Sequence, residues 1–165
     1  MIVTSETKYA DFAEYEEFVD EASKAEIKQQ AERYFKPCHT LTLDEFWGIM
    51  RGDYSLIGDA SEPTVLQIYW CKRFSDFCEE FAKECEGMHI QPTPEETAAQ
   101  NGTIPMEAQE AMLVFTREYF GLPSFFAAGE RTIGEYLTAR KDRYNQDRAR
   151  RNYEAAQRAK MKKKK

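Results

Sequence analysis

The stretch LTLDEFWGIMRGDYSLIG, residues 41–58, decides the fold of this chain. Thr42 and Glu45 have the spacing of a capping box, in which each side chain accepts from the other residue's backbone N–H at the start of a helix. The short helix that follows carries apolar residues over more than half of its circumference: Leu43, Phe46, Trp47, Ile49 and Met50. So wide an apolar surface has to be wrapped by other elements, so we expect a core helix that ends in a turn at Gly52.

Long helices are predicted on both sides of this stretch. Residues 6–35 contain no Gly or Pro and repeat apolar residues at spacings of three and four, and Pro37 follows them. Residues 65–86 also lack a helix breaker, and Gly87 comes next. Their aromatic stripe, which we expect to cover the helix of Trp47, consists of Leu66, Trp70, Phe74, Phe77 and Phe81.

The rest of the chain also has helical patterns. We expect one or two turns after Pro94, a helix that opens at Pro105, and an apolar connector or short helix over residues 124–129. A last helix begins near Thr132 and runs to the end, with few apolar residues beyond Tyr144. No segment alternates as a strand would. The sequence therefore predicts an all-α fold, a compact bundle of four to five helices with a long projecting basic C-terminal helix.

Charge divides the chain into two predicted parts. Residues 1–139 carry 11 Lys/Arg and 26 Asp/Glu, a net charge of -15, and residues 140–165 carry 12 and 3, a net charge of +9. We therefore predict an acidic helical domain over 1–139 and a basic helical tail over 140–165, a division typical of an interaction tail. The candidate partner-binding residues are acidic on the first helix and basic on the tail: Asp11, Glu14, Glu17, Asp20, Glu21, Arg140, Lys141, Arg143, Arg148, Arg150 and Arg151.

The basic tail admits three kinds of partner. The positive charges of the tail could neutralise the phosphates of a nucleic acid. However, the acidic body would repel DNA within about 8 Å at physiological salt, and the sequence has no base-reading motif. A protein partner is therefore preferred. Self-association between the acidic first helix of one copy and the basic tail of another is also open.

The residues that bear chemistry do not form a recognisable site. Cys71, Cys78 and Cys85 are seven residues apart, hence about 10 Å apart along one helix face, too far for one metal ion. Zinc at Cys85, His89, Cys38 and His39 lacks a C-x-x-C spacing, and a Glu-x-x-His pair occurs only at residues 86–89, interrupted by Gly87. We expect no catalytic residue, metal or cofactor, and so a binding protein rather than an enzyme.

The cysteines also bear on location. There are four of them, with no signal peptide and no apolar run of about 20 residues. The sequence therefore predicts a cytoplasmic protein without a membrane partner.

Two features carry a resemblance to a known family. Residues 41–58, together with IYWCKRFSDFC at 68–78, resemble small helical proteins of the tail-morphogenesis clusters of tailed phages, over about a quarter of the chain. Met161 followed by four lysines, which an A-rich run must encode, is similar to the end of tail assembly chaperones, which are made as a short and a frameshifted longer form.

The resemblance implies a helical binder in the host cell cytoplasm that coats the tape-measure protein and recruits tail-tube subunits, without catalytic residues. One alternative is a virion structural connector or adaptor subunit. Another is an accessory nucleic-acid binder that uses the basic C-terminal tail.

Overall fold

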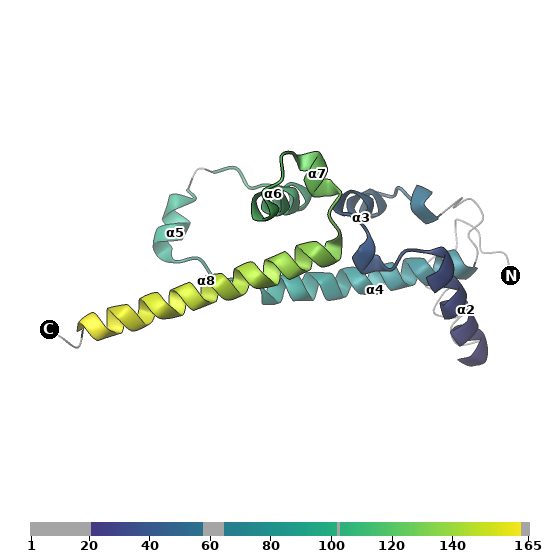
Figure 1. The fold of residues 1–165 in the computed structure, drawn as a ribbon, viewed down its shortest axis with the longest axis horizontal. Helices are drawn as coiled ribbons and strands as arrows, with labels where there is room; N and C mark the ends of the chain where they lie inside the picture. Colours follow the sequence, from purple (N-terminus) through teal and green to yellow (C-terminus); the bar gives the residue numbers. More distant parts are fainter. Residues whose placement is uncertain (1–20, 58–64, 102, 163–165) are drawn as a thin grey trace. The chain divides into compact units, whose positions relative to one another are not determined.

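The computed structural model describes residues 21–57, 65–101 and 103–162 (Figure 1). Over these residues the fold is all-α, with no strand. The α-helices are α2 Glu21–Tyr34, α3 Leu43–Met50, α4 Val65–Gly87, α5 Pro94–Ala99, α6 Ala108–Phe120, α7 Phe125–Gly129 and α8 Ile133–Lys162, and two 3-10 helices are η1 Cys38–Thr40 and η2 Ser55–Ile57. The all-α prediction is confirmed. The helices outnumber the predicted four to five because α5 and α7 form as short helices of their own.

The chain divides into two compact units, Met1–Phe81 and Ala82–Lys165, so that the boundary falls inside α4. The predicted division at residue 140 concerns charge and stays a prediction, and α8 passes through that point without a break. The predicted first helix is described only from Glu21 onward.

The first unit is built on the predicted core helix α3. The backbone N–H of Thr42 donates to Glu45 Oε2 at 2.9 Å and that of Glu45 donates to Thr42 Oγ1 at 3.1 Å, which confirms the capping box. Phe46 is 3% exposed, and its ring centroid lies 5.6 Å from that of Phe74 and 5.5 Å from that of Phe81. The aromatic stripe of α4 therefore packs on α3, as predicted, with Phe46 at the centre of the contact.

Polar contacts fix the segment between α2 and α3 to its neighbours. Trp70 Nε1 donates to the carbonyl oxygen of Lys36 at 3.0 Å, while Lys36 Nζ lies 2.6 Å from Glu45 Oε1. Burial raises the pKa of Glu45, but the bonds from Lys36 and Thr42 outweigh it and hold that pKa below its usual range. At the other end of α3, Gly52 turns the chain with a φ of +90°, a conformation that favours glycine.

The second unit packs α6 against α7 and α8. Its buried residues are Met112, Thr116, Ala128, Gly129, Ile133, Tyr136 and Ala139. The ring of Phe115 on α6 meets that of Tyr136 on α8 edge to face, with centroids 5.6 Å apart. α6 ends at Gly121 with a φ of +62°, and the backbone N–H of Leu122 donates to the carbonyl of Arg117 at 2.9 Å, which is the Schellman pattern.

The start of α6 corrects one prediction. The helix begins at Ala108, three residues beyond the expected opening at Pro105. Glu107 has extended backbone angles, φ -65° and ψ 155°, and its carbonyl accepts from the N–H of Ala111 at 2.9 Å. Glu107 is therefore the N-cap residue, and Pro105 lies in the exposed linker before it.

Candidate functional site

The candidate interaction element is helix α8. Its start is fixed by a second capping box, in which the N–H of Thr132 donates to Glu135 Oε2 at 2.8 Å and that of Glu135 donates to Thr132 Oγ1 at 3.1 Å. The hydrogen bond from the backbone N–H of Thr132 lowers the pKa of Glu135 most, and the nearby Arg131 lowers it further, so this pKa lies below its usual range. The negative charge therefore stays at the positive end of the helix dipole.

Burial changes along α8. In the first turns Ile133, Tyr136 and Ala139 are 0%, 6% and 2% exposed. Beyond Tyr144 every side chain described up to residue 161 is exposed, except Asp147, Arg151 and Gln157, which are half-buried. The first part of α8 therefore belongs to the core of the second unit, while residues 145–161 form a mostly solvated helix.

Three of the predicted basic residues contact other elements of the second unit. The guanidinium of Arg140 lies over the Phe115 ring, 5.4 Å from its centroid, as in a cation–π pair. Lys141 forms an ion pair with Glu84, and Arg151 donates from Nη2 to Glu96 Oε2 at 2.9 Å. A partner that used these side chains would have to compete with an intramolecular contact.

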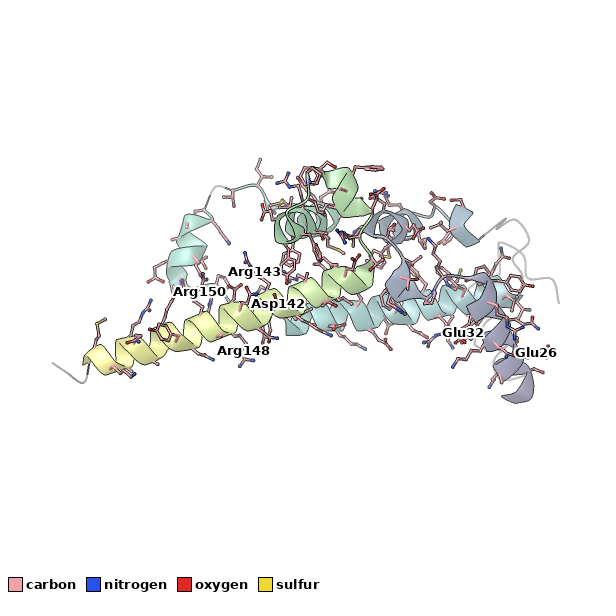
Figure 2. All side chains as sticks on the ribbon, in the orientation of Figure 1. Glu26, Glu32, Asp142, Arg143, Arg148 and Arg150 are labelled. Atoms are coloured by element: carbon pink, nitrogen blue, oxygen red, sulfur yellow. The ribbon has the colours of Figure 1, made fainter. Side chains whose placement is uncertain are left out.

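The other three lie along α8 itself, as the labelled side chains in Figure 2 show. Arg143 and Arg150, two turns apart on one face, lie 4.0 and 3.7 Å from the carboxylate of Asp147, and their side chains are 60% and 65% exposed. Arg148, on the opposite side, donates from Nη1 to the phenol oxygen of Tyr144 at 3.2 Å. Solvated pairs within one helix contribute only about 0.3–0.5 kcal/mol, so these arginines can exchange partners at small cost.

The acidic half of the prediction lies mostly outside the described residues. The described residues do not include Asp11, Glu14, Glu17 or Asp20. They begin with Glu21, which is the first residue of α2. The described helix α2 has three acidic and three basic residues, so the acidic excess predicted for residues 6–35 precedes it. Glu26 and Glu32 on α2, labelled in Figure 2, bond within the helix, to Gln30 at 3.0 Å and to Lys28 at 3.9 Å.

Sequence reasoning missed the acidic partners of the basic helix. No local pattern distinguishes Glu84, Glu96 or Asp142 from the other charged residues of the sequence as partners in these contacts. In the structure the phenol of Tyr119 donates to Asp142 Oδ2 at 2.5 Å, and this bond raises the pKa of Tyr119. The contacting residues are separated by between 23 and 60 positions in the chain, so no local spacing could have indicated them.

The four cysteines are half-buried free thiols, so they are less enclosed than core residues would be. Burial raises the pKa of each, and that of Cys78 reaches about 11, with a smaller contribution from Cys38. Cys78 Sγ lies 3.8 Å from Met50 Sδ. Among the described residues, no three side chains of His, Cys, Asp or Glu converge as a metal site would require.

Comparisons of the chain with protein families, with curated proteins and with solved structures give no match. The resemblance to phage tail-morphogenesis proteins therefore stays a prediction. None of the described helices is both long and apolar enough to cross a membrane.

Proposed function

We propose that this chain is a non-enzymatic helical binding protein, similar to the tail assembly chaperones of tailed phages, and that residues 143–161 of α8 are its partner-binding element. The observation that carries the proposal is the change in burial along α8. A helix that continues for more than four turns beyond its own core, with basic side chains in solvent, is typical of an element that binds another molecule.

The arrangement of charge supports an acidic protein surface as the partner. Residues 143–161 contain six Lys/Arg and two Asp/Glu. Arg143, Arg148 and Arg150 extend on more than one side of the helix, which suits a partner that wraps α8 rather than a flat surface. In a phage tail this partner would be the tape-measure or tail-tube protein.

Binding assays with charge-reversal variants test the proposal. The full chain would be titrated with the purified products of the genes that flank its own, by calorimetry and size-exclusion chromatography. The triple variant R143E/R148E/R150E should lose at least tenfold in affinity. The control K28E/R33E/K83E changes the net charge equally, at exposed positions outside α8, and should bind nearly as well as the unaltered chain. Equal losses in both variants would show that net charge, rather than α8, governs binding.

The same material separates the alternatives. A purified chain that forms stable rings without a partner would support the connector or adaptor. An affinity for DNA that falls steeply with salt and disappears when residues 140–165 are removed would support the accessory nucleic-acid binder.

A second test addresses the phage resemblance. The gene would be expressed from its native locus with an N-terminal tag and its downstream DNA, and the intact mass of every tagged product would be determined. A minor product extended in a shifted frame beyond the lysine run would support the chaperone, and the absence of such a product would remove that support.

A further inference from the structure

The segment that contains α5 has almost no burial. Every described residue from 91 to 108 is exposed, and α5 itself buries none of its side chains. The helix is nevertheless complete in itself. Pro94 occupies its first turn, the N–H of Thr93 donates to Glu96 Oε2 at 2.7 Å, and that of Glu96 donates to Thr93 Oγ1 at 3.2 Å. α5 therefore owes its helical structure to local bonds rather than to packing.

One arginine of α8 binds this segment at two points. Arg151 Nη1 donates to the carbonyl of Gln91 at 2.9 Å, and Nη2 donates to Glu96 Oε2 at 2.9 Å and to Oε1 at 3.2 Å. The planar guanidinium thus holds the carbonyl two residues before the N-cap Thr93 and the carboxylate that completes the cap. The side chain of Arg151 is 32% exposed, compared with 65% for its neighbour Arg150.

We infer that α5 is an acidic strap that masks Arg151, so that a partner with carboxylates must displace Glu96 before it can use the whole basic surface of α8. This inference rests on the proposed function of α8 as a partner-binding element. Glu96 supplies to Arg151 the same chemistry that an acidic partner would supply, and it does so from within the chain.

Release of the strap breaks few contacts. The bonds between Thr93 and Glu96 do not involve Arg151, so its release breaks none of them directly. Because every described residue from 91 to 108 is exposed, none of those residues forms part of a core that displacement would open. Glu95 lies on the same helix and contributes the same charge without contacting Arg151, which makes it a matched control.

Two substitutions in the full chain test the strap. Glu96→Gln removes the charge that holds Arg151, while glutamine still completes the capping box. Glu95→Gln changes the net charge equally and leaves the contact in place. The first measurement is hydrogen exchange of the amides in residues 91–100, and the second is the affinity for a labelled polyglutamate peptide, which stands in for an acidic partner.

We expect Glu96→Gln to raise exchange in this segment at least threefold and to tighten polyglutamate binding at least threefold, with much smaller changes for Glu95→Gln. Equal exchange in the two variants would overturn the strap. Faster exchange in Glu96→Gln alone, without tighter binding, would overturn its role as a competitor. If even the unaltered chain fails to bind polyglutamate and the flanking gene products, the proposed function fails, whatever the exchange shows.

Discussion

Substitution of Phe46 tests whether the first unit depends on the contact between α3 and α4. Phe46 is 3% exposed, and its ring lies against the rings of Trp47, Phe74 and Phe81 at centroid distances of 5.5, 5.6 and 5.5 Å. Truncation of a buried phenylalanine to alanine costs about 3–5 kcal/mol through lost burial and the cavity that remains. Phe46→Leu keeps most of the volume but loses the ring contacts, for which we expect about 1–2 kcal/mol.

Tryptophan fluorescence isolates this effect. The chain has two tryptophans, Trp47 and Trp70, and both lie in the first unit. Urea unfolding followed by their fluorescence therefore reports on that unit. With a slope of about 1.5 kcal/mol per molar urea, Phe46→Leu should lower the midpoint by about 1 M. Phe46→Ala should lower it by about 2–3 M, or leave the unit unfolded in buffer.

A surface variant in the same unit supplies the control. Tyr34 on α2 is 75% exposed, so Tyr34→Ala should change the free energy of unfolding by less than about 0.5 kcal/mol. If Phe46→Ala moved the fluorescence midpoint no further than Tyr34→Ala, the proposed packing of α4 on α3 would be refuted.

Three further predictions concern single sites. The pKa of Glu45 is lowered in the folded state, so its stabilisation is present above the unfolded pKa and is lost as pH falls through the folded value. Glu45→Gln should therefore flatten the decline of the fluorescence midpoint between about pH 5 and pH 3, and an unchanged slope would contradict this. Gly121 has a φ of +62° with nothing within 4 Å of an added Cβ, so Gly121→Ala should cost about 1 kcal/mol through strain alone. Gly87→Ala is equally free of steric contact but has no positive φ, so it should be neutral or stabilising. Thermal melts of the two variants, followed by circular dichroism, measure this difference. Cys78, with a pKa of about 11, should react with a thiol reagent at pH 8 far more slowly in the folded chain than in urea, as peptide mapping of the labelled protein would show, and equal rates would contradict its burial.

Much of the helical framework could be predicted because its signals are local. The capping boxes at Thr42 and Thr132 each need only a hydroxyl and a carboxylate three residues apart, and both form as the spacing predicts. The aromatic stripe on α4 could be predicted because a helix places residues three and four apart on one face. The error at Pro105 shows the limit of such signals, since proline is compatible with the linker as well as with a first turn.

The same distinction between local signals and tertiary contacts applies to the candidate site. Sequence by itself determined that the basic charge gathers at residues 140–165 and that apolar anchors become rare after Tyr144, because composition and helical period are properties of neighbouring residues. Only the tertiary structure decided which of those charges are already engaged. Arg151 meets Glu96, and Lys141 meets Glu84, across more than fifty residues of chain. Such contacts depend on how the rest of the second unit packs against α8. The residues that flank a surface carboxylate in the sequence do not indicate which arginine it will contact.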